Sequence, residues 1–595
     1  MGLSKNFRFW FPVVVLVGTA VYSTYGVLRV NFFLPVDVPH YEFCDEIPPI
    51  RGGIYCSSHG HEGYPIVKSM PSWEYRLDPV AMTNRVVRPA GSKTPRTPKE
   101  QAQIIADMLQ LEPERIYEMM EKTEGSGFRN QFLAVSGDKS VYDKLSDRNE
   151  VSGVKISETY ERKYFESNRL SHVIKGVTQK FNKELQGIPG QLRGKKDANG
   201  RLIKDKIELN IPSKPGADIH LTVDHFLQKL VESELAAGVA EYGASAGWCV
   251  ILDVKTAKVL AMSSYPELDI TKTYDEKDSI LVNKVIGHTF EPGSVMKVVT
   301  AAAAIDCGFT TPKTRFSTKR DEKNASGEYK YYKLPNDSHA LPPTITLTEA
   351  IVESSNIVIG KLGYDLGRKR LYEYMTKFGF GKKVGIDLPN EEKGILGDYR
   401  KWDKATWSRA PIGQGISVTP IQMASAYQAI ANDGIRKRPY VVDKIVNADR
   451  KDVHNRQYDS GERVISASTA YVVREMMLNV ATKEGTARRA KIPGYSIAGK
   501  TGTAQKVVNG RYAPGLYVAT FCGIVPSGVV KRYPDDIDPA PPEVVVLVSL
   551  DFDEKRQYHQ GGNSAGPVFK RITEKAMRYL GVAPDRLDEV SDEES

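Results

Sequence analysis

Three short motifs contain the residue types needed for acyl transfer through a serine. They are Ser294-Val295-Met296-Lys297, Ser354-Ser355-Asn356 and Lys500-Thr501-Gly502-Thr503. A serine hydroxyl is a poor nucleophile and needs a base beside it, and a nearby lysine can be that base. Each motif alone is weak, because Ser136 and Ser152 also begin Ser-x-x-Lys sequences. The specific signal is their order along the chain, with separations of 60 and 146 residues.

The first motif predicts a nucleophile with its base. Residues three apart share one face of a helix, so Ser294 and Lys297 meet if a helix begins at Ser294. Pro292-Gly293 favours such a start, and the apolar run 298–305 predicts that the helix is buried. A lysine that burial keeps deprotonated can accept the serine proton. The alternative, a surface serine with a solvated lysine, fits the polar surroundings of Ser136 and Ser152 better.

The second motif follows a predicted helix that begins with the capping box Thr346-Leu347-Thr348-Glu349. The Ser354 hydroxyl can relay a proton between the lysine, the nucleophile and the leaving amine. The Asn356 amide can hold a substrate amide and the lysine. The structural alternative is an ordinary turn after a helix, to which Ser-Ser-Asn is well suited.

The third motif follows a predicted strand at 495–498. An edge strand can align an extended peptide, and Gly502 allows that peptide to approach closely. Lys500 provides positive charge for a substrate carboxylate, and Thr501 and Thr503 provide hydroxyl groups. A glycine turn with a solvated lysine is the alternative. The joint occurrence of the three motifs outweighs the three structural alternatives.

The elements that must position these motifs predict an α+β fold. Alternating or apolar runs predict strands, helical spacing predicts helices, and the pattern is strands, a helical block, strands and a final helix. This order predicts an antiparallel sheet flanked by helices. The predicted strands are 219–223, 247–252, 258–262, 495–498, 517–524 and 543–550, and the predicted helices cover 227–237, much of 296–374 and 566–580.

The beginning of the chain predicts a membrane anchor. Residues 9–28 are nearly all apolar and uncharged, and a helix of this length spans roughly 30 Å, the thickness of a bilayer core. Lys5 and Arg8 precede the run, which favours a cytoplasmic N-terminus and an extracytoplasmic remainder. A cleaved signal peptide is the alternative, and a mature N-terminus beyond Leu34 in mass spectrometry would establish it.

The length of 595 residues requires more than one domain. We expect a cytoplasmic tail at 1–8, a transmembrane helix at 9–28, an extracytoplasmic pedestal at 29–215, a catalytic domain at 216–582 and an acidic tail at 583–595. Within the pedestal, Thr97-Pro98-Lys99-Glu100 predicts a helix start. The rest looks strand-poor, with 187–200 as an exposed loop.

Composition excludes other functions rather than selecting one. A net charge of +9 is mild for this length and dispersed, so it predicts a basic surface and not a nucleic-acid site. The five cysteines lack the close spacing of a zinc or redox site. Cys249, Cys307 and Cys522 lie in apolar runs and are predicted to be buried core residues. Pairing of Cys44 with Cys56 stays open.

The motifs, anchor and pedestal together resemble a class B penicillin-binding protein, a monofunctional peptidoglycan D,D-transpeptidase with a β-lactamase-like catalytic domain. The sequence at 517–526 is more similar to division-specific (septal) members than to elongation members. One departure follows Tyr55, where Cys56-Ser57-Ser58-His59-Gly60 replaces the usual Asp-Arg-Asn-Gly. Further matches are 51–55, 222–224, 290–294, 378–381, 385–389, 413–415 and 561–562.

The resemblance implies four catalytic roles. Ser294 is the acylated nucleophile, Lys297 its general base, Ser354 a proton relay, and Asn356 the residue that orients the donor peptide. The acyl-enzyme loses D-Ala, and an amine of a neighbouring stem peptide then forms the cross-link. β-Lactams acylate the same serine. Neither a metal nor an organic cofactor is implied.

The resemblance also implies how the donor peptide is held. Lys500, Thr501 and Thr503 bind the terminal carboxylate of the D-Ala-D-Ala stem, beside Gly502. The N–H groups of Ser294 and Thr503 form the oxyanion hole. The implied setting is a single-pass protein of the cytoplasmic membrane whose partner is a multispanning glycosyltransferase.

Three alternatives differ in what they require. A membrane-anchored serine β-lactamase needs a group that activates water for deacylation, and no convincing glutamate motif stands out. A bifunctional enzyme needs a glycosyltransferase module before the transpeptidase, and 51–213 has no acidic pattern suited to one. A β-lactam sensor needs more membrane spans and a cytoplasmic output domain, and the sequence indicates neither. A non-catalytic scaffold tolerates the loss of Ser294 or Lys297, yet both are present.

Overall fold

The computed structural model describes residues 41–586 except for short gaps, and these residues form two units. The units comprise 1–51 with 186–216, and 52–185 with 217–595. The predicted membrane span at 9–28 lies outside the described residues, and among those described no helix has the length and apolar character to cross a bilayer. The gaps are 59–60, 122–129, 148, 167, 197–201, 325, 455–458, 483–484, 534–535 and 555.

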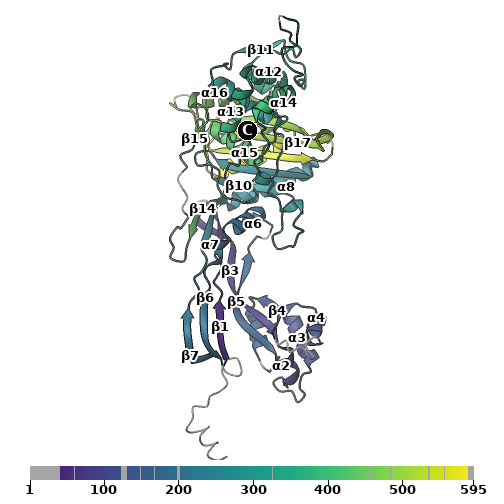
Figure 1. The fold of residues 1–595 in the computed structure, drawn as a ribbon, viewed down its shortest axis with the longest axis vertical. Coiled ribbons are helices and arrows are strands. Elements are labelled where there is room, and N and C mark those ends of the chain that lie inside the picture. Colours follow the sequence, from purple (N-terminus) through teal and green to yellow (C-terminus); the bar gives the residue numbers. More distant parts are fainter. Residues whose placement is uncertain are drawn as a thin grey trace, which may run out of the picture. The chain divides into compact units, whose positions relative to one another are not determined.

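The smaller unit contains a three-stranded antiparallel sheet in the order β1-β6-β7 (Figure 1). Its strands are β1 (Tyr41–Ile47), β6 (Gly190–Lys196) and β7 (Leu202–Ile211). The prediction of an exposed loop over 187–200 is therefore wrong for β6. Glycines and lysines dominate that strand, so it lacks the apolar alternation that reveals a strand.

The larger unit begins with a sheet in the order β14-β8-β2-β3-β4, with β5 also paired to β3. The capped helix predicted after Thr97 is confirmed as α3 (Pro98–Leu109), with its capping box and N-terminal proline. The other strands and helices of this region are β2 (Ile54–Ser58), β3 (His61–Leu77), β4 (Gln131–Ser136), β5 (Val154–Tyr164), β8 (Asp218–Asp224), β14 (Val442–Val446), α2 (Pro79–Asn84), α4 (Pro113–Glu121), α5 (Lys139–Ser146), α6 (Ser171–Lys180) and α7 (Asn182–Gln186).

The expectation of a strand-poor pedestal is wrong, and β5 shows why. This strand pairs with β3 along its whole length but has no fully buried residue. Charged side chains therefore occur throughout it, and the sequence shows no hydrophobic face to identify a strand. Ser152, just before β5, is buried and donates to Gln101 Oε1 at 2.9 Å, which is a structural role.

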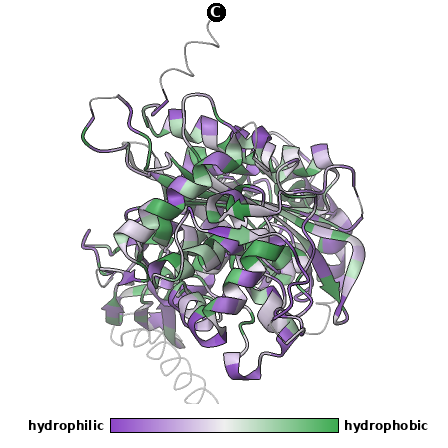
Figure 2. Cartoon of the chain, turned by 90° about the horizontal axis from the view of Figure 1, so that it is seen from above, coloured by the Kyte–Doolittle hydropathy of each residue, from purple (hydrophilic) through white to green (hydrophobic). Residues whose placement is uncertain are grey.

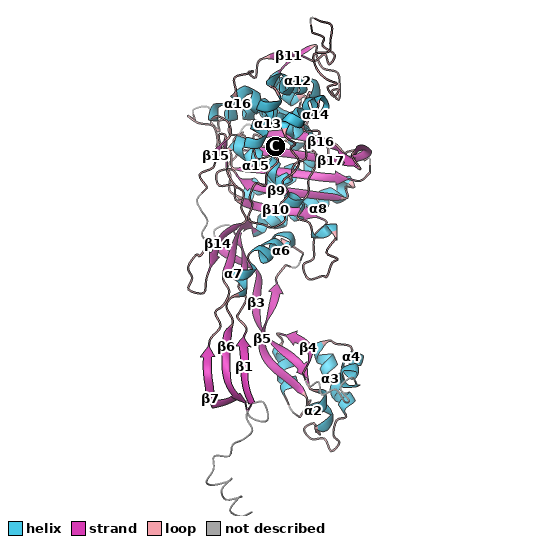
Figure 3. Ribbon diagram, in the orientation of Figure 1, coloured by secondary structure: helices cyan, strands magenta, loops and turns pink. Residues whose placement is uncertain are grey.

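The main sheet of the larger unit has five antiparallel strands in the order β10-β9-β18-β17-β16 (Figure 3). The central strands β9 and β18 are almost entirely buried, because helices cover both faces of the sheet. The order leaves β16 at one edge. The strands are β9 (Ala246–Asp253), β10 (Val259–Tyr265), β16 (Ala498–Val508), β17 (Arg511–Val525) and β18 (Val544–Phe552).

Two groups of helices enclose this sheet. Helices α8 (His225–Tyr242) and α17 (Ala565–Tyr579) pack together and on the sheet, whereas α15 (Pro420–Ala431) packs on β9, β17 and β18. Hydrophobic residues, green in Figure 2, are concentrated in the helices and strands of the interior. The remaining helices are η2 (Ser279–Leu281), α9 (Lys284–Gly287), η3 (Gly293–Met296), α10 (Lys297–Asp306), α11 (Leu347–Val352), α12 (Asn356–Leu366), α13 (Arg368–Lys377), η4 (Tyr399–Lys401), α14 (Lys404–Arg409), η5 (Ala410–Ile412), α16 (Ala467–Met477), η6 (Leu478–Ala481) and η7 (Arg488–Ala490).

The predicted order of strands, helical block, strands and final helix agrees with this arrangement. One boundary is wrong: the strand expected at 495–498 begins only at Ala498 and continues through the Lys-Thr-Gly-Thr motif. The short pairs β11 (Arg315–Ser317) with β12 (Thr344–Thr346), and β13 (Ile435–Arg436) with β15 (Glu462–Arg463), lie outside the main sheet.

The first described residues of the predicted acidic tail belong to the folded structure. Asp585 is 1% exposed and accepts hydrogen bonds from the N–H and the hydroxyl of Ser496. The Ser496 hydroxyl oxygen lies 2.6 Å from the Ser527 hydroxyl, which donates to it. This buried group lies directly before β16, so the fold extends beyond 582.

The five cysteines are free thiols in this structure. Cys249 and Cys522 are buried, as predicted. Cys307 is exposed, so its prediction as a core residue is wrong. It follows the last residue of α10, where the apolar run ends and the chain turns toward solvent.

Candidate active site

The predicted nucleophile lies on a tight turn ahead of a buried helix. Ser294 belongs to the 3₁₀ turn η3, and α10 begins at Lys297, three residues later than the sequence suggested. The Lys297 N–H donates to the Ser294 carbonyl across this turn. Because residues three apart eclipse one another in a 3₁₀ helix, the two side chains still share one face.

Lys297 is fully buried and is held by the second motif. Its Nζ donates to the Ser354 carbonyl at 2.5 Å, to Ser354 Oγ at 3.2 Å and to Asn356 Oδ1 at 2.7 Å. Burial, assisted by the charge of Lys500 and opposed by Asp337, holds the pKa of Lys297 well below the usual lysine value. A neutral lysine beside a serine hydroxyl is the form that can accept a proton.

Ser354 and Asn356 lie at the junction of α11 and α12. Ser354 has a φ of 58°, a left-handed conformation that non-glycine residues rarely adopt. Ser355 caps α12 by accepting from the Val358 N–H at 3.1 Å. The predicted capping box at Thr346 is confirmed at the start of α11. The sharp junction brings the Ser354 hydroxyl and the Asn356 amide to the same lysine.

Asp337, which belongs to none of the sequence motifs, holds this junction through hydrogen bonds. Its carboxylate accepts from the Ser355 hydroxyl at 3.0 Å and from the N–H groups of Asn356 and Ile357 at 2.5 and 3.1 Å. The Asn336 carbonyl accepts from Asn356 Nδ2 at 2.7 Å. With its Nδ2 so occupied, the Asn356 amide must present Oδ1 to Lys297. No motif or spacing in the sequence predicts that the loop containing Asp337 contacts the second motif.

The third motif lies within β16, at the edge of the main sheet. Thr503 Oγ1 accepts from the Gly561 N–H at 3.0 Å, and Thr501 Oγ1 is 3.2 Å from Thr486 Oγ1. A side chain at Gly502 would begin 3.1 Å from the Pro292 carbonyl, so its absence lets β16 lie against the nucleophile turn.

Lys500 belongs to the edge strand β16, and its side chain is fully buried. Its Nζ donates weakly to the carbonyl and hydroxyl oxygens of Thr501, both at 3.4 Å. Burial lowers the pKa of Lys500 to about 7. The site therefore has two buried lysines whose charged forms are both disfavoured.

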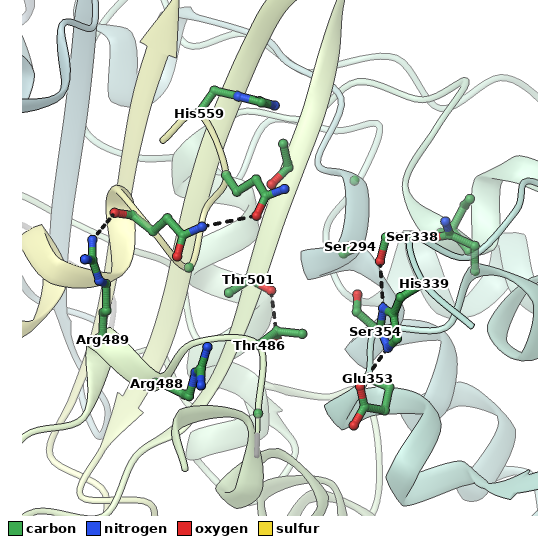
Figure 4. Close-up of a pocket in the computed structure, with 18 of the residues that line it drawn as sticks. Ser294, Ser338, His339, Glu353, Ser354, Thr486, Arg488, Arg489, Thr501 and His559 are labelled. Carbon is green, nitrogen blue, oxygen red and sulfur yellow. Dashed lines mark hydrogen bonds and ion pairs between the residues drawn. The ribbon is translucent and has the colours of Figure 1, made fainter. Parts of the chain in front are cut away.

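A cleft of about 680 Å³ joins the three motifs (Figure 4). Its lining includes Ser294, Ser354 and Asn356 on one side and Thr501 and Thr503 on the other. Residues outside the sequence motifs line it as well, and they include Ser338, His339, Glu353, Thr486, Arg488, Arg489 and His559. The structure thus brings together residues more than 200 positions apart in the chain.

Gly413 is a second positioning residue, quoted in the sequence analysis without a role. It has a φ of 78°, and an added Cβ would lie 2.2 Å from the Gly293 carbonyl oxygen. The Gly293 N–H donates to the Gly413 carbonyl at 3.0 Å, so the two backbones are in direct contact.

We expect Gly413→Ala to push the Ser294 turn away from its position. Since a displacement of about 1 Å at a reacting group can cost on the order of 10²-fold in rate, acylation should slow by about that factor. Gly415→Ala is the matched control, because Gly415 also has a positive φ of 71° but its added Cβ has no neighbour nearer than 3.9 Å. Labelling rates with a fluorescent penicillin compare the two variants, and equal slowing would contradict the steric explanation.

Fold and site together define a serine acyl-transfer protein. The family model of the penicillin binding protein transpeptidase domain matches residues 247–574. Stage V sporulation protein D of Bacillus subtilis is 30% identical over 508 residues, covering 82% of this chain and 74% of that protein. The peptidoglycan D,D-transpeptidase FtsI of Escherichia coli is 31% identical over 422 residues, covering 71% of this chain and 66% of that protein.

The fold is similar to that of a solved peptidoglycan synthetase from Bifidobacterium adolescentis. The TM-score is 0.67 at 22% identity, with 91% of this chain and 98% of that chain covered. The chain belongs to the penicillin-binding protein transpeptidase family, as a class B member. The resemblance stated from the three motifs is confirmed.

Proposed function

We propose that this chain is a peptidoglycan D,D-transpeptidase that works through an acyl-enzyme on Ser294. One observation carries the proposal: the buried Lys297, whose pKa is lowered, directly follows the nucleophile turn and donates to Ser354 and Asn356, which line one cleft together with Ser294. The similarity to FtsI, which is named for this activity, supports the substrate class.

In the first step, Ser294 Oγ attacks the carbonyl carbon of the D-Ala-D-Ala peptide bond while Lys297 accepts the hydroxyl proton. The N–H groups of Ser294 and Thr503 would stabilise the oxyanion that forms. The proton then passes through Ser354 to the departing amine, which the 3.2 Å contact with Lys297 Nζ supports. D-Ala leaves, and the donor peptide remains as an ester on Ser294.

The donor peptide would bind as an additional strand along β16. The edge position of this strand provides backbone groups, and Gly502 leaves room close to the nucleophile. Lys500, Thr501 and Thr503 would hold the terminal carboxylate. β-Lactams, which present a carboxylate beside a reactive amide, would acylate the same serine.

The test is incubation of the purified chain with a fluorescent penicillin, followed by a denaturing gel and peptide mapping. A lasting adduct on Ser294 is expected of a transpeptidase, whose acyl-enzyme awaits an amine. Loss of the drug without an adduct would indicate a β-lactamase. Intact drug with no adduct would indicate a non-catalytic scaffold.

The proposed carboxylate contact predicts a pH dependence of donor binding. Lys500, with its pKa of about 7, is charged below that pH and loses its charge above it. Binding of a D-Ala-terminated peptide should therefore weaken as pH rises through 7, by up to about tenfold per pH unit. Equilibrium binding to Ser294→Ala measures this without acylation. A peptide amide without the carboxylate should show no such trend, and equal trends would contradict the role.

The cellular setting is also a proposal. The apolar run at 9–28 supports a single anchor in the cytoplasmic membrane, with the catalytic domain extracytoplasmic. The similarity at 517–526 supports a role at the division septum, beside a multispanning glycosyltransferase. Labelling the chain at its C-terminus and testing protease access from outside intact cells would contradict the orientation if no access were found.

A further inference from the structure

Three cleft residues outside the family motifs form a hydrogen-bonded line (Figure 4). His339 Nε2 lies 3.0 Å from Glu353 Oε2, and His339 Nδ1 lies 3.1 Å from Ser338 Oγ. All three residues line the same cleft as Ser294 and Ser354. The line joins a hydroxyl, an imidazole and a carboxylate, which is a set of groups suited to proton transfer.

The chemistry of the groups fixes the direction of the hydrogen bonds. An ionised carboxylate can only accept, so Nε2 of His339 must donate its hydrogen to Glu353. In a neutral ring Nδ1 is then an acceptor, and the Ser338 hydroxyl donates to it. The Ser338 oxygen keeps its own lone pairs, so it can accept a hydrogen bond from a donor in the cleft. Glu353 would stabilise the imidazolium once the ring takes up a proton.

The line is anchored to the second motif at both ends. Glu353 directly precedes Ser354, and Ser338 directly follows Asp337, the residue that holds the Ser355–Asn356 backbone. The backbone of both ends of the line is therefore tied to the backbone of the second motif. Lys297, the other group of this wall that can accept a proton, is buried and already faces Ser354 and Asn356.

The two sides of the cleft differ in charge. Arg488 and Arg489 lie across the cleft from Glu353 and His339 (Figure 4). The cationic side suits the carboxylate of a donor peptide. The opposite side has the Glu353 carboxylate, which suits a positively charged ligand.

We propose that Ser338, His339 and Glu353 form the subsite that receives the attacking amine of the second step. This inference rests on the proposed transpeptidase function and names the group that binds there, a primary ammonium. Such an amine is protonated at neutral pH and cannot attack until it loses a proton. Its proton passes through the Ser338 hydroxyl to His339 Nδ1. The imidazolium later returns that proton to water.

The neutral nitrogen then attacks the acyl carbon of the Ser294 ester. A carbon–nitrogen bond forms and the bond between the acyl carbon and Ser294 Oγ breaks. The second proton of the nitrogen returns to Ser294 Oγ through Ser354 and Lys297, which restores the free enzyme. Hydrolysis and attack by an already neutral amine do not need the ammonium to be deprotonated.

The experiment separates the two steps in the full-length chain. A thioester analogue of the donor peptide forms the acyl-enzyme, which is offered either a D-amino amide or hydroxylamine. Hydroxylamine is neutral near neutral pH, so it does not have to lose a proton before it attacks. We expect His339→Gln to lower attack by the D-amino amide, relative to attack by hydroxylamine, on the order of 10²-fold. Glutamine can still donate to Glu353, so the variant removes the base and keeps that contact.

Two comparisons make the result decisive. Ser338→Ala, which removes the hydroxyl relay, should lower the same ratio. His559→Gln is the matched control, because His559 lines the cleft but its Nδ1 faces the Arg556 carbonyl at 2.6 Å and its ratio should stay unchanged. Equal loss with both nucleophiles in His339→Gln, or no loss with either, would overturn the proposal. Failure of the wild-type chain to form a Ser294 adduct would instead overturn the proposed function itself.

Discussion

Replacing Ser294 by alanine is expected to abolish covalent penicillin labelling and peptide cross-linking while the chain stays folded. The substitution removes the attacking oxygen, without which no ester with the drug or the donor peptide can form. The backbone bonds of the turn, including Lys297 N–H to the Ser294 carbonyl, do not involve the hydroxyl. Gel labelling measures the adduct, and circular dichroism with thermal unfolding checks the fold.

The control uses a second serine of the same sequence pattern. Ser136 also begins a Ser-x-x-Lys sequence but ends strand β4, outside the cleft. Ser136→Ala should label like the wild type. An adduct that persists in Ser294→Ala, or that maps to another residue, would refute the assignment of the nucleophile.

Replacing Lys297 by methionine is expected to slow acylation by about 10²- to 10⁴-fold, the range for loss of a general base. Methionine fills similar space without a charge, and a site that already disfavours the charged lysine should accept it. The effect should appear in the rate of labelling at saturating penicillin rather than in the amount of folded protein. An unchanged rate at neutral pH would rule out the role of base.

Lys361 supplies the matched control for this variant. It is also a buried lysine of the helical block, and its Nζ binds Glu322 at 2.6 Å and the Ser317 and Lys319 carbonyls. If Lys297 acted only as a buried structural link, Lys361→Met would slow labelling of the folded protein equally. We expect Lys361→Met to lower stability and to leave the labelling rate of the folded fraction intact.

The motif residues could be found from the sequence because their chemistry is local. Ser294 and Lys297 are three residues apart, and a helical or 3₁₀ turn is enough to bring them together. Likewise, the capping boxes at Thr97 and Thr346 predict where two helices begin, and the structure confirms both starts. The order of strands, helical block and strands was sufficient to predict an antiparallel sheet flanked by helices.

The supporting residues could not be found, because their roles depend on contacts distant in the sequence. In the sequence Asp337 is one residue of a polar loop. Only the structure shows that its carboxylate accepts hydrogen bonds from the N–H groups at the start of α12. The role of Gly413 depends on Gly293, which is 120 positions earlier. The pedestal strands were missed for another reason. With no buried face in β5, hydrophobic alternation gives no signal.

The buried carboxylate of Asp585 makes the end of the chain part of the catalytic scaffold. It holds Ser496, two residues before the strand that contains Lys500, although it lies in the segment predicted as an acidic tail. Cutting the chain before this residue would leave the buried Ser496 N–H without an acceptor and loosen the entry to β16. The position of a tag or a truncation therefore influences how tightly the donor peptide binds along β16. Shortened proteins that end after 586 should give drug-binding rates comparable with the whole molecule, and slightly shorter ones should not.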